Sequence, residues 1–398
     1  MSKRRKATRK QTKKHNRRLV LKTIYDAGEI SRAGVARVTD LTRPTVSAIA
    51  AELMADGLIQ EVGRTLSSGG KPATLLGVIA DSRHLVGLDL ANSEFRGAVI
   101  NLRGEIRHRF SIPIQDQDGE AALALVYQLV DELNASADGP ILGIGIGAPG
   151  LMDVDQGVVR AAVNLDWRDL PLGDILIERY GVPVYIANDS QVAALGEFTF
   201  GQHDDIQNLA VLKVGRGVGA GIILDGVLYY GDGYGAGEIG HFKVVEKGDL
   251  CRCGHFGCLE TIASTQAIVR QAKITANSPA SLLHRFAAAS EKITTEIVLD
   301  AVKAGDAALV DIIANAGRYL GFAVAGLVSI LNIETVVVAG SGARFGSVLL
   351  ESLKQEMQRR SLSQLAQNTH VSASALGDDI VILGAAALLL HNELGLVG

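Results

Sequence analysis

The three cysteines of the chain fall within eight residues, and this cluster constrains the fold more than any other feature of the sequence. They stand at Cys251, Cys253 and Cys258, and His241 precedes the first of them by ten positions. Three thiolates and one imidazole form a complete tetrahedral ligand set for Zn²⁺. His255 competes for the fourth position, but it lies inside a tight glycine turn. Because the protein would fill all four positions, the sequence predicts one structural zinc ion per chain and not a hydrolytic one.

Composition narrows the class of protein. The chain of 398 residues is 47% hydrophobic and 21% charged, which is typical of a globular α/β protein and excludes a disordered or fibrous one. At roughly 100–200 residues per domain, its length predicts two or three domains. No uninterrupted apolar run reaches the ~20 residues that cross a bilayer, and the basic N-terminus lacks the apolar segment of a secretory signal. Three cysteines cannot make a disulfide framework, so we expect a cytoplasmic protein.

Charge is distributed unevenly along the chain. Residues 1–72 contain 16 Lys and Arg against 6 Asp and Glu, a net charge of +10, whereas the remainder carries −14. A basic head on an acidic body is typical of a protein that binds nucleic acid at one end. A solvated basic tail would produce part of the same signal, and we expect residues 1–15 to form such a disordered tail.

The pattern after the tail predicts a winged helix-turn-helix domain over residues 16–80. A first short helix is followed by two more, and Ser31 and Thr42 are placed to cap the second and the third. Two strands, over 58–63 and 73–78, would form the wing around a glycine-rich loop. A small helical bundle that mediates protein contacts is the alternative.

The third helix of this domain would be the one that reads DNA. Its apolar residues fall at i, i+3, i+4 and i+7 and predict one buried stripe, which consists of Val46, Ile49, Ala50 and Leu53. The opposite face begins with short polar or basic side chains, which suit phosphates and base edges. The predicted DNA-binding residues are Arg43, Thr45 and Ser47 on this helix, Arg32 on the preceding helix and Lys71 in the wing loop.

The rest of the chain, residues 81–398, predicts an α/β body with two lobes. A meander of strands, a helix, a strand and another helix fill residues 85–198, and a similar series follows. This duplication indicates two sheets with a cleft between them, and ligands of such sheets bind at the carboxyl ends of the strands. We expect lobe 1 to contain residues 81–190 together with a C-terminal helix over 381–398, and lobe 2 to contain residues 191–380.

Several motifs of the body resemble the signature of the ROK family, which is named for repressors, open reading frames and kinases. The resemblance is carried by Gly237-Glu238-Ile239-Gly240-His241, by the cysteine motif up to Glu260, by Ile186-Ala187-Asn188-Asp189 and by the glycine-rich segment 143–150. It extends from about residue 85 to the C-terminus. It implies an actin-like fold of two lobes with a structural zinc loop. The winged helix-turn-helix in front resembles the transcriptional repressor branch, whose members respond to N-acetylglucosamine, glucose or xylose.

The resemblance also implies a ligand and its contacts. Members of the family hold a sugar between the lobes, and the matching residues of this chain are Gly150, Asn164, Asn188, Asp189, Glu238, His241 and Glu260. Carboxylates and an amide suit a ligand rich in hydroxyl groups. His241 can bind zinc through one ring nitrogen and face the sugar with the other. A loop-capping role is the alternative for Asn164, and a helix-capping role is the alternative for Asp189.

An ATP-dependent sugar kinase with a DNA-binding head is the alternative function. In the kinase branch, the residue that matches Asp189 is the general base that deprotonates the sugar hydroxyl. The phosphate loops argue against catalysis, because Asp89-Leu90-Ala91-Asn92-Ser93 replaces Asp-x-Gly-Gly-Thr and Gly215-Arg216-Gly217 replaces Gly-Thr-Gly. Phosphoryl transfer depends on positioning, so two altered loops should cost it heavily. Arg216 offers a charge that can instead recruit a sugar phosphate.

Together these features predict a sugar-responsive regulator of transcription that is not an enzyme, and most simply a repressor of genes for carbohydrate uptake or catabolism. The expected partners are double-stranded operator DNA and a sugar or sugar phosphate. We also expect a homodimer or homotetramer, because paired recognition helices read half-sites about one helical turn apart. Regulation by a protein partner is a third reading, for which no residues in the sequence identify a contact.

Overall fold

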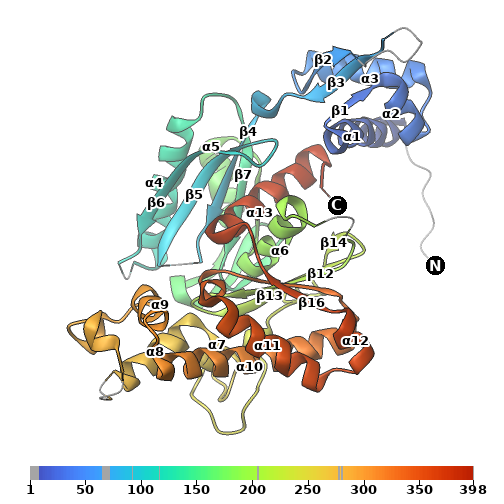
Figure 1. Ribbon diagram of the computed structural model, residues 1–398. Coiled ribbons are helices and arrows are strands. Elements are labelled where there is room, and N and C mark those ends of the chain that lie inside the picture. Colours follow the sequence, from blue (N-terminus) through green and yellow to red (C-terminus); the bar gives the residue numbers. More distant parts are fainter. Residues whose placement is uncertain are drawn as a thin grey trace.

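The computed structural model describes residues 9–64, 72–91, 93–115, 117–203, 206–276, 278 and 281–397. Figure 1 shows a small N-terminal domain at one end and a larger body in which two five-stranded sheets form two lobes. The C-terminal residues return to lie beside helix α1 of the N-terminal domain.

The N-terminal domain has the predicted winged helix-turn-helix architecture. Its elements are α1 (Arg9–Ala27), β1 (Glu29–Ser31), α2 (Arg32–Thr39), α3 (Arg43–Ala55), β2 (Ile59–Arg64) and β3 (Thr74–Val78), with the sheet order β1-β3-β2. Ser31 and Thr42 cap α2 and α3 as predicted, because their side-chain oxygens accept hydrogen bonds from the N–H groups of Gly34 and Thr45. All four residues of the predicted apolar stripe on α3 are buried. Strand β1 was not predicted, since three residues are too few to show an alternating pattern.

Helix α1 begins at Arg9, earlier than the sequence analysis predicted. Residues 9–15 are therefore helical and not part of a disordered tail, while residues 1–8 lie outside the described part of the chain. Lys, Arg and Gln are good helix formers, and they fill most of this segment. The ammonium group of Lys13 also lies 2.8 Å from the carboxylate of Glu52 on α3, so an ion pair holds the first turns of α1 against α3.

Lobe 1 is built on the sheet β11-β7-β4-β5-β6. Its strands are β4 (His84–Asp89), β5 (Glu94–Asn101), β6 (Ile106–Pro113), β7 (Ile141–Ala148) and β11 (Val184–Asn188). Strands β4 to β6 form the predicted antiparallel meander, and β7 and β11 run parallel to β4. Val86 and Leu88 belong to the core beneath α4 (Gly119–Ser136), whereas Leu85 belongs to the core around α13 (Ile380–Leu389). The two faces of β4 are thus covered by helices from distant parts of the chain.

Lobe 2 is built on a second sheet, β14-β13-β12-β15-β16. Its strands are β12 (Leu209–Val214), β13 (Val218–Leu224), β14 (Val227–Leu228), β15 (Thr335–Ala339) and β16 (His370–Ala373). One face carries the long helices α10 (Ala307–Leu331) and α11 (Gly346–Arg360), and the other carries α6 (Asp189–Phe200). The lobe also contains the α-helices α7 (Glu260–Ala263), α8 (Thr265–Thr275), α9 (Thr295–Lys303) and α12 (Ser363–Asn368).

Helix α10 is long and apolar enough to cross a membrane by length and composition alone. Half of its most apolar stretch is buried inside the protein. A Cβ atom at Gly317 or Gly321 would lie 2.5 or 2.3 Å from the carbonyl oxygen of Leu349 or Leu353 on α11. These short approaches show that α10 is a packing helix of lobe 2.

A small three-stranded sheet of the body was not predicted. It consists of β8 (Leu151–Asp153), β9 (Val158–Ala162) and β10 (Trp167–Leu170), and helix α5 (Leu172–Tyr180) follows it. Strands of three to five residues separated by tight turns carry too little alternation to be recognised in a sequence.

Helices α6 and α13 cross at very short distance between the two sheets. A Cβ atom at Gly384 would lie 1.8 Å from the carbonyl oxygen of Val192, and one at Gly196 would lie 2.4 Å from that of Ile380. Glycine at both positions lets the two backbones touch. Because α6 also packs on β12 and β13 while α13 packs on β4 and β7, this crossing joins the two sheets.

The N-terminal domain is docked on the body through α1. Arg18 and Lys22 donate hydrogen bonds to the backbone carbonyls of Asn392 and Leu396, at 2.5 and 3.1 Å. From lobe 1, the guanidinium group of Arg103 lies 4.2 Å from the centre of the Tyr25 ring and donates a hydrogen bond of 2.7 Å to the Tyr25 carbonyl. The turn that follows α13 is therefore held against the DNA-binding domain (Figure 1).

We predict opposite effects of alanine at two helical glycines. Gly384→Ala should lower the free energy of unfolding by about 1–3 kcal/mol, because its methyl group meets the α6 backbone. Gly326→Ala should raise it by about 0.5–1 kcal/mol, because a Cβ there meets none of the described atoms within 4 Å and alanine favours a helix. Urea and thermal denaturation of both variants measure the difference. A Gly384→Ala protein as stable as the wild type would contradict the packing of α6 on α13.

Candidate functional site

A cavity of about 350 Å³ lies between the lobes and is lined by all seven residues that the family resemblance assigned to a sugar. From lobe 1 come Gly150 in the turn after β7, Asn164 in the short helix Val163–Leu165, Asn188 at the end of β11 and Asp189 at the start of α6. From lobe 2 come Glu238 and His241 at the short helix Ile239–His241, and Glu260 at the start of α7. Carboxylates, amides and an imidazole therefore converge on one cavity, and this set of donors and acceptors suits a polyhydroxyl ligand.

Asn188 connects residues on two sides of the cavity through hydrogen bonds. Its side-chain amide donates to the carbonyl of Gly150 at 2.9 Å and to the carboxylate of Glu238 at 3.4 Å. Its oxygen accepts from the N–H of Ser190 at 2.9 Å, so Asn188 is the N-cap of α6. The alternative reading of Asp189 as the helix cap is therefore wrong, because the residue before it fills that role and leaves the Asp189 carboxylate to other partners.

The loop between β12 and β13 holds Glu260 at the cavity. The Oε2 atom of Glu260 accepts a hydrogen bond of 3.1 Å from the N–H of Val218. A Cβ atom at Gly217 would lie 2.4 Å from the same oxygen. The glycine in this loop thus lets the backbone approach the carboxylate.

Negative charge accumulates at the lobe 2 side of the cavity. Burial raises the pKa of Glu238, and although the nearby His241 ring opposes this, the carboxylates of Asp189 and Glu260 raise it further. A hydroxyl group that donates to these carboxylates would relieve part of the repulsion.

Two basic side chains of the cavity were not among the predicted sugar contacts. Lys213 on β12 lies with its ammonium nitrogen 2.6 Å from the Oδ2 atom of Asp189. Arg252, between two of the cysteines, donates a hydrogen bond to the side-chain oxygen of Asn164 across the cleft. The position of Lys213 within the apolar run of β12 could have predicted a buried charge. Its partner could not be predicted, because Asp189 lies 24 residues away in the sequence.

The predicted metal ligands form one cluster beside the cavity. One ligand atom from each of His241, Cys251, Cys253 and Cys258 can be chosen so that all four lie within 4.8 Å of one another. The Nδ1 atom of His241 is 3.5 Å from the sulfur of Cys251, and the sulfurs of Cys253 and Cys258 are 3.6 Å apart. His255, the competing ligand, lies 3.6 Å from the Cys253 sulfur, but it is His241 that groups with all three cysteines. The geometry thus favours His241 as the fourth ligand of a bound metal.

The chemistry of the thiols also indicates a cation. Burial and the neighbouring Cys253 and Cys251 thiols raise the pKa of Cys258 to about 12, and burial raises the pKa of Cys251 as well. The pKa of Cys253 is instead lowered to about 6, so the three thiols differ, and a nearby positive charge would favour the thiolate form of all three. A divalent metal ion supplies that charge, so these residues fit a metal site.

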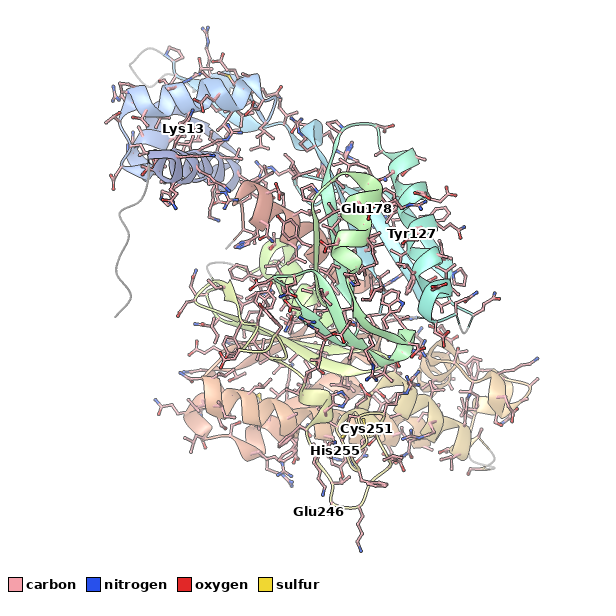
Figure 2. The ribbon with its side chains drawn as sticks, turned by 180° about the vertical axis from the view of Figure 1, so that it is seen from behind. Lys13, Tyr127, Glu178, Glu246, Cys251 and His255 are labelled. Atoms are coloured by element: carbon pink, nitrogen blue, oxygen red, sulfur yellow. The ribbon has the colours of Figure 1, made fainter. Side chains whose placement is uncertain are left out.

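His241 connects the metal cluster to the cavity. While Nδ1 faces the cysteines, Nε2 lies 3.8 Å from the carboxylate of Glu238. One ring thus faces both the cysteine cluster and the cavity. Figure 2 shows Cys251 and His255 in the irregular segment of lobe 2, with Glu246 at its outer tip and Lys13 of the DNA-binding domain at the opposite end of the molecule.

A second cavity of about 660 Å³ lies beside the first, and its lining includes both altered phosphate loops. Asp89 is fully buried, pairs with Arg96 at 2.5 Å and accepts from the N–H of Ala91 at 3.0 Å. Asn92 lies outside the described residues. Asp89 is therefore already neutralised by a neighbouring arginine on β5.

The predicted DNA-binding residues occupy different environments. Arg43 and Ser47 are exposed on α3, whereas Thr45 is partly buried and its hydroxyl is 2.8 Å from that of the cap residue Thr42. Arg32 forms an ion pair of 3.0 Å with Glu61 on the wing strand β2. Lys71 lies outside the described residues. The structure therefore presents Arg43 and Ser47 most openly to a nucleic acid.

Comparison with known proteins agrees with this architecture. The profile of the ROK family matches residues 85–392, and a winged helix-turn-helix DNA-binding profile matches residues 13–60. The chain is 34% identical over 386 residues to the xylose repressor of Caldicellulosiruptor bescii, covering 96% of this chain and 97% of that protein. Fold and site thus define a two-lobed protein of the sugar-kinase type with a DNA-binding domain in front. The chain belongs to the ROK family.

Solved structures confirm the predicted fold class. A ROK family transcriptional regulator, a homologue of the E. coli MLC protein, matches with a TM-score of 0.83 and 31% identity over 97% of this chain and 98% of that one. A ROK family glucokinase from Streptomyces griseus, in complex with glucose and AMPPNP, matches with a TM-score of 0.71 and 30% identity. That match covers 77% of this chain and 98% of the glucokinase. The fold of the body is therefore shared by a regulator and an enzyme.

We predict that metal binding depends on His241 and not on His255. His241→Ala should lose the metal, because it removes a ligand from the cluster, whereas His255→Ala should keep about one equivalent per chain. Elemental analysis of both purified variants and the wild type makes the comparison. Equal metal content in the two variants would show that the fourth ligand has been assigned wrongly.

Proposed function

We propose that this protein is a sugar-responsive transcriptional repressor of the ROK family. The observation that carries the proposal is the direct docking of a winged helix-turn-helix domain on a two-lobed body whose cleft holds a cavity rich in hydrogen-bond acceptors. A relative that matches over nearly its whole length is named a xylose repressor. The effector would be a sugar or sugar phosphate, and the target would be an operator in double-stranded DNA.

The proposed mechanism is a shift between arrangements of the two lobes. A sugar that contacts Asp189 at the start of α6 and Glu260 in lobe 2 would favour one arrangement over others. Movement of α6 would pass to α13, because the backbone contact at Gly384 leaves no room for adjustment. The turn after α13 contacts α1, so the recognition helices of a homodimer would leave the register of their half-sites.

We propose zinc as the metal of the cluster and assign it a structural role. The donor set of three thiolates and one imidazole is the one that zinc prefers, and the protein leaves no position for a reacting water. The bound ion would hold the loop that carries His241 and Arg252, and both of these side chains line the cavity. Zinc would therefore support the sugar site through the positions of its ligands.

A sugar kinase with a DNA-binding head is the second candidate. It is favoured by the likeness of the body to a glucokinase and by Asp189, which matches the general base of the kinase branch. The ion pairs argue against it, because Asp89 is bound to Arg96 and Asp189 is bound to Lys213. Coupled measurement of ADP release with glucose and xylose distinguishes the candidates. Sustained turnover that is lost in Asp189→Ala would replace the repressor proposal with the kinase.

We predict that DNA binding depends on Arg43. Arg43→Ala should weaken binding to duplexes selected from a random library by the wild type, and it should reduce the slope of log K against log salt by about 1, because one phosphate contact is lost. Arg285→Ala, which removes an exposed charge from lobe 2, is the matched control and should change neither quantity. Fluorescence anisotropy at several salt concentrations measures both. A salt slope near zero for the wild type would rule out operator binding.

We predict that one sugar in a panel of free and phosphorylated sugars raises the thermal midpoint of the metal-loaded protein. A ligand at about a hundred times its Kd adds about 2.7 kcal/mol of stability. Glu260→Gln should abolish the shift, because it removes a charged acceptor from the cavity while the amide can still accept from Val218. Glu351→Gln, an exposed change on α11, is the control. If every sugar leaves the midpoint of the wild type unchanged, the cavity does not bind the effector proposed here.

A further inference from the structure

Lys213 is a buried charge that the proposed function does not yet use. It stands on β12 between Leu212 and Val214, and 9% of its surface is exposed. Alternate residues of this strand belong to different cores: Leu212 and Val214 lie in the core of α10 and α11, and Val211 lies in the core around α6. Lys213 therefore points toward α6, and its ammonium group reaches Asp189 at the first residue of that helix.

The ammonium group lies between the two cavities of the cleft. Lys213 lines both of them, whereas Asp189 lines the first and Asp89 lines the second. Burial by itself would lower the pKa of Lys213, but the charges of Asp189 and Asp89 more than offset burial and raise it. The lysine thus stays charged between two carboxylates, one on each side.

Packing does not explain a lysine at this position. The neighbouring residues of β12 are apolar, and a buried ion pair is often no more stable than well-packed apolar side chains of similar volume. The charge must therefore act on its surroundings. Its partner is the carboxylate at the centre of the proposed sugar site, and that carboxylate also accepts a hydrogen bond of 3.3 Å from the Ser190 hydroxyl.

We propose that Lys213 is a positioning residue that fixes the Asp189 carboxylate as a hydrogen-bond acceptor for the sugar and prevents it from acting as a base. The proposal rests on sugar binding in the cleft. A carboxylate whose Oδ2 atom is held at 2.6 Å by an ammonium group keeps its charge and orientation, and its remaining lone pairs can accept from sugar hydroxyls. The same ammonium group occupies the boundary that a phosphoryl group would have to cross between the two cavities.

In this arrangement basic side chains of the protein itself, Arg96 and Lys213, compensate the charges of Asp89 and Asp189. Other charged groups that line the two cavities come from both lobes and include Asp89 and Arg96 from lobe 1, and Arg216, Glu238 and Glu260 from lobe 2. With Asp189 and Asp89 both neutralised by basic side chains of the protein, the lobes can close on a sugar without a second ligand. Sugar binding would then be independent of ATP.

The test is a double-mutant cycle on sugar affinity in the full-length, metal-loaded chain, with D-xylose and D-glucose as probes in calorimetry. Lys213→Met should weaken binding at least about tenfold, because Asp189 loses the cation that orients it. In the Asp189→Asn background the same substitution should cost about twofold or less, because the carboxylate on which Lys213 acts is already gone. Lys303→Met removes an exposed lysine from α9 and should leave affinity unchanged in either background.

An equal loss in both backgrounds would overturn the proposal and leave Lys213 a structural role only, and so would wild-type affinity in Lys213→Met. ADP release by the wild type that requires Asp189 would overturn it as well, because Asp189 would then be a base. If Lys213→Met does not fold, Lys213→Gln keeps a hydrogen bond to Asp189 without the charge and replaces it in the cycle. A wild type that binds neither sugar would instead contradict the proposed function on which this inference rests.

Discussion

The backbone contact between α6 and α13 is the constraint on which the geometry of the cleft and of the DNA-binding domain depends. Gly384 and Gly196 allow the two helices to touch without intervening side chains, so neither helix can move by a change of rotamer alone. Helix α6 begins at Asp189 in the smaller cavity, and α13 leads to the C-terminal turn that contacts α1. One rigid crossing therefore lies between the ligand site and the domain that would bind DNA.

The loop that carries the metal cluster forms part of the lining of the cavity. A bound ion would hold the loop at four points, and the side chains of this loop that reach the cavity include His241, through Nε2, and Arg252, through its contact with Asn164. Arg252 crosses from lobe 2 to lobe 1, so the position of the metal loop is coupled to the opening of the cleft. A metal remote from any reaction can in this way shape the site that recognises a ligand.

Charge pairing in the cleft supports the proposed role as a sensor over phosphoryl transfer. The buried Asp89 faces Arg96, and the partly buried Asp189 faces Lys213, so both carboxylates already have partners within the protein. A kinase must leave such groups available to a metal–nucleotide complex and to a sugar hydroxyl. The body thus keeps the fold of a sugar kinase while its charges are satisfied internally, a combination that suits a sensor.

The features that the sequence alone predicts are local ones. Ser31 and Thr42 cap their helices, the stripe on α3 is buried and the cysteine motif gathers around His241, because each depends on residues within about twenty positions or on a repeat with a known period. The family resemblance supplied the seven residues that line the cavity. The partner of Lys213 and the α6–α13 crossing were not predictable in this way. Each depends on contacts between segments far apart in the chain, where propensity is weak and the cost of burying a charge or closing a helix crossing is settled only by what packs against it.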